Sequence, residues 1–167
     1  MKRSSTSDSA VKNAAGGKGK ACETFSAQSI LVPLDFSDPS RSALRYARSL
    51  AEQTGGKLIL FYALEPVATP DFACNPLVME PAQAAKAAEL QLQKICEQEG
   101  VKDSLVEHTV VRSGVAHAQI ADVAQKLGAD LIVISTHGHT GLKHVIMGST
   151  AERVVRHSGC PVLVVRA

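Results

Sequence analysis

The segment STHGHTGLKHVIMGST, from Ser135 to Thr150, places glycines, hydroxyl side chains and three histidines directly after an apolar run. Glycine lets the backbone approach a ligand closely, and successive amides can form a concavity that binds an anion. The four residues that begin at Ser149 match the S-x-x-E capping box, which predicts a helix right after Gly148 with Ser149 as its cap. Helix N-termini favour anions. The segment is therefore a candidate phosphate site, with a metal site and a plain loop as alternatives.

A second candidate, Asp35, directly follows the apolar stretch SILVPL. An aspartate at a strand end can accept hydrogen bonds from ribose hydroxyls or hold a hydrated Mg²⁺. A turn or capping aspartate fits the composition equally well. The histidines His137, His139 and His144 suggest a metal, but no carboxylate or thiolate accompanies them at a fixed spacing, so we expect none there.

Two standard nucleotide motifs are missing from the chain. No Gly-Lys-Ser/Thr completes a Walker A loop, and no G-x-G-x-x-G follows the first apolar run. Phosphoryl transfer also relies on positioned cations and a group that orients water, and the sequence identifies neither. If the protein is an enzyme, we expect at most a weak ATPase.

Apolar runs alternate with amphipathic helical patterns along the chain. Strands are predicted at residues 29–34, 57–64, 105–111, 130–134 and 161–165. Helices are predicted at 81–98, 115–127 and 149–157, and a further one between a cap at residues 37–39 and a stop at Gly55. The third strand is the most polar, which suggests an edge of the sheet. This alternation predicts an α/β fold, a doubly wound five-stranded parallel sheet with helices on both faces. Ligands of such sheets bind beyond the strands' carboxyl ends, where connections part to opposite faces, so the loops after the first and fourth strands are the candidates.

Composition restricts the class of protein. The 167 residues suffice for one domain, expected at residues 28–167, and residues 1–27 are polar and small enough to predict a disordered tail. The tail carries five basic and two acidic residues and the remainder 13 and 14, so we expect no binding of nucleic acid. No apolar run approaches the roughly 20 residues that span a bilayer, and no secretory signal is evident, so we expect no membrane partner and a cytoplasmic location. The four cysteines form no C-x-x-C pair.

From about Gln28 to Arg166 the sequence resembles the universal stress protein family. The resemblance is carried by ILVPLDFS, by the strand that runs into Glu65, and by STHGHTGLKHVIMGSTAERVVRHSGCPVLVV. In nucleotide-binding members the loop reads G-x-x-G, nine residues, then G-S/T. Here Ser135 replaces the first glycine, nine residues follow Gly138, and Gly148 completes the pattern. The Cβ of a serine at that position could crowd a phosphate or a ribose.

The resemblance implies the sheet order 3-2-1-4-5 and an adenine nucleotide as ligand, ATP, with or without Mg²⁺. Asp35 would contact the nucleoside, the backbone near Ala63 would meet adenine, and Ile134 would line the base pocket. The residues implied for ribose and phosphates are Ser135, His137, Gly138, Gly148, Ser149 and Thr150, and Pro33 belongs to the same cofactor-binding set. The family also commonly forms homodimers through the last strand, here PVLVV.

Three functions stay open at this point. The first is an ATP-binding stress protein that acts as a sensor or regulator, with slow hydrolysis. The second is a nucleotide-free dimeric interaction module with no ligand in the glycine loop. The third is a hydrolase with His137 or Asp35 as its base.

Overall fold

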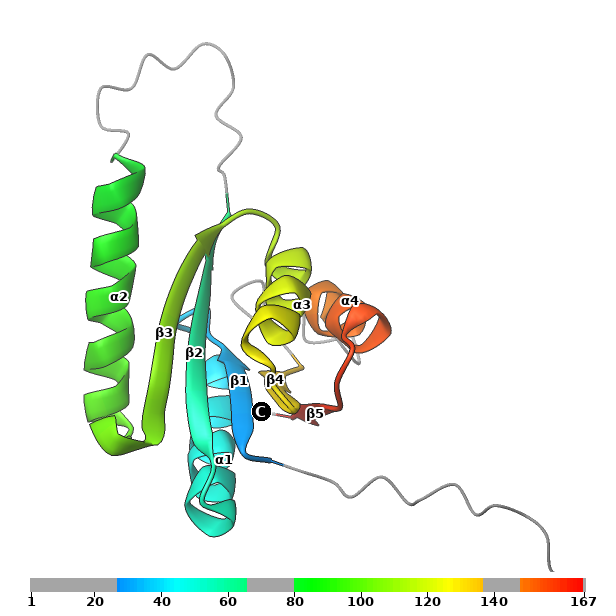
Figure 1. The fold of residues 1–167 in the computed structure, drawn as a ribbon. Coiled ribbons are helices and arrows are strands. Elements are labelled where there is room, and N and C mark those ends of the chain that lie inside the picture. The colour runs from blue at the N-terminus through cyan, green and yellow to red at the C-terminus, as the bar shows by residue number, and fades with distance from the viewer. Residues whose placement is uncertain (1–26, 66–79, 137–147, 167) are drawn as a thin grey trace, which may run out of the picture.

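A computed structural model describes residues 27–65, 80–136 and 148–166 of the chain (Figure 1). The elements, in order, are β1 (Ser29–Pro33), α1 (Asp38–Thr54), β2 (Lys57–Leu64), α2 (Pro81–Gln98), the short 3₁₀ helix η1 (Asp103–Leu105), β3 (Val106–Ser113), α3 (Ala116–Leu127), β4 (Leu131–Ser135), α4 (Ser149–His157) and β5 (Val162–Val165). The strands form one parallel sheet in the order β3-β2-β1-β4-β5. The predicted fold class and strand order are thus confirmed.

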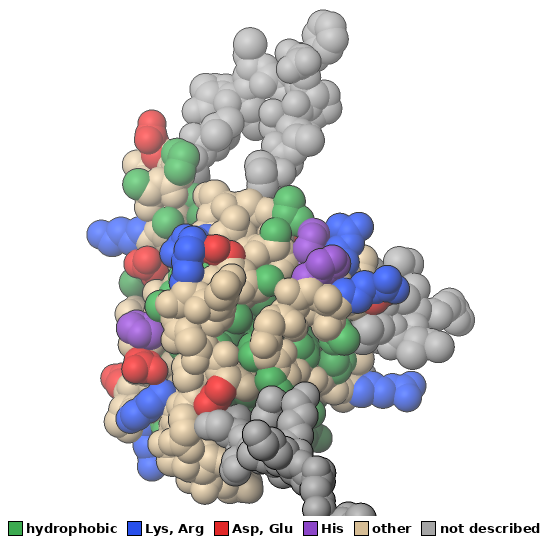
Figure 2. Space-filling model, turned by 45° about the vertical axis from the view of Figure 1, so that its right-hand side comes forward, with side chains coloured by type: hydrophobic (Ala, Val, Ile, Leu, Met, Phe, Trp, Pro, Cys, Tyr) green, Lys and Arg blue, Asp and Glu red, His purple; other side chains and the backbone are tan. Residues whose placement is uncertain are grey.

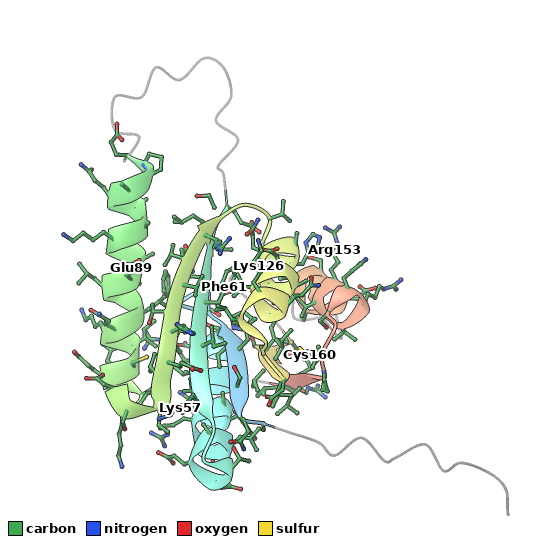
Figure 3. All side chains as sticks on the ribbon, viewed as in Figure 1. Lys57, Phe61, Glu89, Lys126, Arg153 and Cys160 are labelled. Carbon is green, nitrogen blue, oxygen red and sulfur yellow. The ribbon has the colours of Figure 1, made fainter. Side chains whose placement is uncertain are left out.

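The side chains of each central strand alternate between two apolar layers. Ile30 and Val32 of β1 belong to the cluster that packs under α1 and α2, whereas Leu31 belongs to the cluster under α3 and α4. Phe61 of β2 lies in the second cluster, between β2 and α3 (Figure 3). A sheet buried on both faces needs strands that are apolar throughout, which is the pattern read from the sequence.

Local signals set the ends of α1. The Ser37 side chain caps its first turn by accepting from the Ser40 amide, Pro39 occupies the first turn, and Gly55 ends the helix at a φ of 72°. The edge position predicted for the third strand is also confirmed, since β3 borders only β2 and three consecutive residues, 107–109, are exposed.

The two connections that bracket the middle of the sheet leave it on opposite sides. β1 lies between β2 and β4. The chain runs from β1 into α1, whose buried side chains belong to the apolar cluster that also contains α2. The chain beyond β4 leads to α4, whose buried side chains belong to the cluster that also contains α3. In Figure 1, α1 accordingly lies on the far side of β1 and α4 on the side of α3. This is the switch point where doubly wound sheets bind ligands.

The chain enters the domain at Ala27, which is buried in the cluster under α1 and α2. The predicted tail, apart from this residue, lies outside the described residues. Among the helices of the described ranges, none combines the length and apolar character that crossing a bilayer requires.

Gly56 is where the entering chain passes closest to the loop between α1 and β2. A Cβ on Gly56 would overlap the carbonyl oxygen of Ala27, and the Gly56 amide is bonded to the carbonyl oxygen of Ala51 at 3.1 Å. Neither backbone segment can withdraw without losing contacts. Gly56→Ala should therefore lower the free energy of unfolding by about 1–3 kcal/mol, measured by urea denaturation.

Gly159 offers a matched control for this substitution. A Cβ added there meets no atom within 4 Å, so Gly159→Ala should leave the urea midpoint nearly unchanged. Equal midpoints for the two variants would contradict the close approach at Gly56.

Candidate functional site

A cavity of about 370 Å³ lies at the carboxyl ends of β1, β2 and β4, bounded by the first residues of α3 and α4. Its lining consists of Pro33, Leu34, Asp35, Ser40, Phe61, Tyr62, Ala63, Glu65, Ala116, Ile120, Ile134, Ser135, Thr136, Gly148, Ser149, Thr150 and Ala151. The volume falls within the range of small-molecule and cofactor sites, roughly 300–1,000 Å³.

Most residues predicted for the site meet in this one cavity. The eight that the structure describes, all of which line the cavity, are Pro33, Asp35, Ala63, Ile134, Ser135, Gly148, Ser149 and Thr150. The other two, His137 and Gly138, lie outside the described residues. Segments far apart in the sequence thus converge at the switch point, where a ligand is predicted.

One part of the cavity is apolar. Phe61, Ile120, Ile134 and Ala151 are each at most 5% exposed, and Ala116 joins the same cluster. These side chains come from two strands and two helices, and they leave an apolar wall against which a flat ring could pack.

The other part of the cavity is built around the start of α4. The Gly148 amide donates to the Thr136 carbonyl oxygen at 2.7 Å, which holds Gly148 in an extended conformation with φ −65° and ψ 151°. The Glu152 amide donates to the Gly148 carbonyl oxygen at 3.0 Å, the first hydrogen bond of the helix. The amides that follow Gly148 are the N-terminal donors of α4, which suit an anion.

The predicted capping box is therefore wrong by one residue. Gly148 is the N-cap of α4, and Ser149 is its first helical residue rather than its cap. The bond between Gly148 and Thr136 fixes the chain direction one residue before the serine. Since φ at Gly148 is negative, what this glycine contributes is the absence of a side chain at the cavity and not a left-handed backbone.

Asp35 is both a turn residue and a residue of the cavity, the two alternatives that the sequence left open. Its Oδ1 accepts hydrogen bonds from the Ser37 amide, at 3.1 Å, and from the Ser37 hydroxyl, so it organises the turn before α1. The same side chain is half-buried and lines the cavity. The turn therefore fixes the position of a carboxylate at the ligand site.

Backbone groups of β2 also face the cavity. The Leu34 amide donates to the Phe61 carbonyl oxygen at 2.8 Å, beyond the last paired residue of β1, Pro33. Alternate residues of a strand direct their N–H and C=O groups to the same neighbouring strand, so Ala63 directs these groups to the same side as Phe61. The pairing of β1 with β2 ends before Ala63, so its N–H and C=O point past the end of β1. A donor and an acceptor thus stand side by side at the cavity.

Tyr62 lies beside two carboxylates at this edge of the sheet. Burial, followed by the charges of Asp35 and Glu65, raises the pKa of Tyr62 above its ordinary value of 10.0. The ring stacks on Phe36 with a centroid distance of 4.3 Å and an interplanar angle of 24°. Tyr62 is therefore a neutral hydroxyl group over the physiological pH range.

Several lining residues were not predicted from the sequence. Thr136 is buried and follows Ser135, the last residue of β4, within the candidate phosphate segment from Ser135 to Thr150. Glu65 follows the end of β2, and Ala116 and Ile120 belong to α3, whose helical pattern offered no reason to expect that it faces a ligand. Only knowledge of which helices flank the switch point could have identified them.

Histidines gather on the surface of α3 and α4 but lie outside the cavity lining. The rings of His117 and His157 have centroids 6.5 Å apart, and Figure 2 shows histidine side chains (purple) close to Lys and Arg (blue) on this face. His137, His139 and His144 lie outside the described residues. Within the described ranges no group of three or more His, Cys, Asp or Glu side chains could hold a metal ion.

A parallel sheet with helices on both faces and a cavity at its switch point defines a doubly wound α/β domain. The chain belongs to the universal stress protein family, whose family model matches residues 27–166. Universal stress protein MJ0531 of Methanocaldococcus jannaschii is 35% identical over 141 residues, which cover 82% of this chain and 81% of that protein.

Solved structures agree with this assignment. Universal stress protein UspA from Lactobacillus plantarum is 28% identical, with a TM-score of 0.71 over 84% of this chain and 98% of that one. Two further structures share the fold at lower identity, each over 84% of this chain and 98% of its own. One is a universal stress protein in complex with cAMP, at 23% identity and a TM-score of 0.61. The other is a universal stress protein from Archaeoglobus fulgidus in complex with dAMP, at 24% identity and a TM-score of 0.55.

The raised pKa of Tyr62 makes stability depend on alkaline pH. The unfolded chain loses the phenol proton first as pH rises past 10.0, so the free energy of unfolding should fall between that pH and the higher folded-state pKa. Tyr62→Phe should reduce this fall, measured by urea denaturation at about pH 9 and about pH 10.5.

The other tyrosine of the chain, Tyr46, is 61% exposed and supplies the control. Tyr46→Phe should retain the alkaline loss of stability that Tyr62→Phe reduces. If the two variants lose equal stability between the two pH values, the environment assigned to Tyr62 is wrong.

Proposed function

We propose that this protein binds an adenine nucleotide, ATP, in the cavity at the switch point and acts as a sensor or regulator in a stress response. The observation that carries the proposal is the convergence of Pro33, Asp35, Ala63, Ile134, Ser135, Gly148, Ser149 and Thr150 on one cavity. These residues come from β1, β2, β4 and α4, and the loops between these elements, and they supply the groups that a nucleotide needs.

Each part of a nucleotide has a matching part of the cavity. The apolar wall that includes Ile134 suits the base, and the N–H and C=O of Ala63 suit its hydrogen-bonding edge. Asp35 is an acceptor for ribose hydroxyls. The phosphates would lie at the first amides of α4, with Ser149 and Thr150 alongside. His137 and Gly138, from the intervening loop, complete the proposed set.

Fold-level likeness supports the choice of an adenine nucleotide. Two proteins that share this fold were solved in complexes with cAMP and dAMP, so the architecture is able to hold an adenosine moiety. The buried Ser135 replaces a glycine of the expected pattern, and its hydroxyl group can offer a phosphate or ribose a hydrogen bond in exchange for the space that its Cβ takes.

Hydrolysis, if the protein performs it, should be slow. Among the described residues that line the cavity there is no lysine or arginine, the usual partners of a transferring phosphoryl group. Mg²⁺ bound to the phosphates would supply part of the missing positive charge, with Asp35 as the carboxylate that could hold it through water. This argues for a binding role over rapid catalysis.

We further propose that two copies of the chain form a homodimer through β5. This strand is at the end of the sheet, and Leu163 in it is 41% exposed. An edge strand of apolar residues invites a second chain. The alternative function, a nucleotide-free interaction module, would keep this interface and lose the ligand, so identifying any small molecule released on denaturing the purified protein separates the two.

Gly148→Val tests the phosphate end of the cavity. The backbone of Gly148 has φ −65° and ψ 151°, which valine adopts readily, so the change adds only bulk where a phosphate would lie. We expect ATP affinity, measured by calorimetry, to fall at least about tenfold, or roughly 1.4 kcal/mol, while the fold is retained.

Gly159→Val is the matched control, since nothing lies within 4 Å of a Cβ at Gly159 and that residue is not part of the cavity lining. This variant should bind ATP like the wild type. Undiminished ATP affinity in Gly148→Val would place the nucleotide elsewhere.

Leu163→Lys tests the dimer. A charge at the centre of β5 should favour the monomer at concentrations where the wild type sediments as a dimer, because burying the ammonium group without a partner is costly. Leu90→Lys, on α2, is the control, since Leu90 is 59% exposed and lies away from β5. A wild type that sediments as a monomer, or a Leu163→Lys variant that stays dimeric, would exclude this interface.

A further inference from the structure

Glu65 has a position in the cavity that the proposed nucleotide contacts do not use. It follows β2 directly, lines the cavity, and accepts a hydrogen bond from the Ala116 amide at 3.1 Å through Oε1. Ala116 is the first residue of α3, whose N-cap, Val115, has no side-chain cap. A carboxylate from another element therefore supplies the cap and the negative charge that favour a helix N-terminus.

The same hydrogen bond fixes the carboxylate at the apolar wall. The Gly114 amide also donates, at 3.0 Å, to the carbonyl oxygen of Leu64, so two bonds tie the start of α3 to the end of β2. The helix wall of the cavity, with Ala116 and Ile120, is thereby held at a set distance from β2. Glu65 cannot leave the cavity rim without breaking the cap of α3.

The order of polar groups along β2 limits what can lie against it. Going toward the carboxyl end of the strand, the groups at the cavity are the N–H of Ala63, the C=O of Ala63 and then the Glu65 side chain, which is on the same face of β2 as Ala63. A flat ring packed on the apolar wall would meet one donor followed by two acceptors. The second acceptor carries a full negative charge.

We propose that Glu65 makes the cavity selective for a purine ring that carries an exocyclic amine. This inference rests on the proposed function and specifies its ligand. An amine has two N–H groups, so it can donate one to the C=O of Ala63 and the other to the Glu65 carboxylate. A carbonyl oxygen in its place would set its lone pairs against both acceptors, and the Glu65 oxygen that the Ala116 amide does not occupy would gain no donor from the ring.

Reversing the ring does not rescue a purine that lacks an amine. If hypoxanthine were turned over, its ring N–H would donate to the C=O of Ala63, and its oxygen would accept from the backbone N–H of Ala63. The atom left opposite Glu65 would then be a carbon with its hydrogen, which gives the carboxylate no adequate partner. Inosine triphosphate (ITP) should therefore bind more weakly than ATP in either orientation.

The test compares ATP with ITP, which differ at this edge of the base and share the ribose and the triphosphate. The wild type should bind ATP at least about tenfold more tightly than ITP, the size expected for one hydrogen bond to a charged group. In Glu65→Gln the ratio should fall by at least about threefold, because the amide can turn its N–H₂ group toward the oxygen of ITP, while the mismatch of that oxygen with the C=O of Ala63 remains. Calorimetry on the full chain measures all four affinities.

Two controls separate selectivity from structure. Glutamine keeps a carbonyl oxygen that can accept from the Ala116 amide, so the urea midpoint of Glu65→Gln shows whether α3 is still tied to β2. Glu107→Gln, an exposed position on β3 outside the cavity lining, should keep the wild-type ratio of ATP to ITP affinity.

Each result has one meaning. A wild type that binds ATP and ITP equally, or a Glu65→Gln variant that binds ATP but keeps the wild-type ratio, overturns the role of Glu65 and leaves the nucleotide site standing. A wild type that binds neither nucleotide overturns the proposed function itself, and this inference with it. The comparison of the two nucleotides on the wild type needs no variant to fold.

Discussion

The cavity depends on β1 parting from β4 before β4 ends. Since the Leu34 amide bonds to β2, the nitrogen of Pro33 faces the other neighbour, β4, and it has no hydrogen to donate. The paired residues of β1 and β4 accordingly stop at Leu31 and Ile132, whereas β4 continues alongside β5 as far as Ser135. The two middle strands separate where α1 and α4 depart to opposite faces. A single residue type thus opens the sheet at its switch point.

The opened site is electrically uneven, which gives a ligand an orientation. Asp35 and Glu65 bring carboxylates to the side of β1 and β2, and the N-terminus of α4 brings its first backbone amides and the positive end of its dipole on the side of β4. A molecule with one uncharged hydrogen-bonding end and one anionic end therefore fits in one direction only. The apolar wall between the two ends strengthens this preference, because charges interact more strongly where water is displaced.

The sequence was sufficient for the fold because each strand in the middle of the sheet is apolar on both faces. A run such as LILF in β2 has no other stable place than between two layers of helices, and the glycine at position 55 ends α1 by its left-handed conformation. These are local properties, readable from composition and spacing. The site was less accessible, although the residues at strand ends, Asp35 and Ser135, could be assigned by the rule for switch points.

What the sequence could not provide are pairings between distant segments. The start of α4 was predicted correctly, but its cap was wrongly assigned to Ser149, because no local pattern reports the bond from the Gly148 amide to Thr136. The place of Glu65 at the cavity was not predicted for the same reason, since its partner, the Ala116 amide, is 51 residues away. In both cases a hydrogen bond between distant segments, rather than a side chain next to the helix, holds the helix N-terminus in place.

The turn after β1 shows how such contacts can hold a costly conformation. Phe36 is the non-glycine residue of the described ranges with a positive φ, 69°, which costs on the order of 1–3 kcal/mol. Its stack on Tyr62 contributes about 0.5–1.5 kcal/mol and the Ser37 cap about 1 kcal/mol, enough to offset most of that cost. The left-handed residue reverses the chain immediately after Asp35, so the carboxylate stays at the cavity while α1 begins. The placement of Asp35 therefore depends on an aromatic contact with β2 as much as on its own turn.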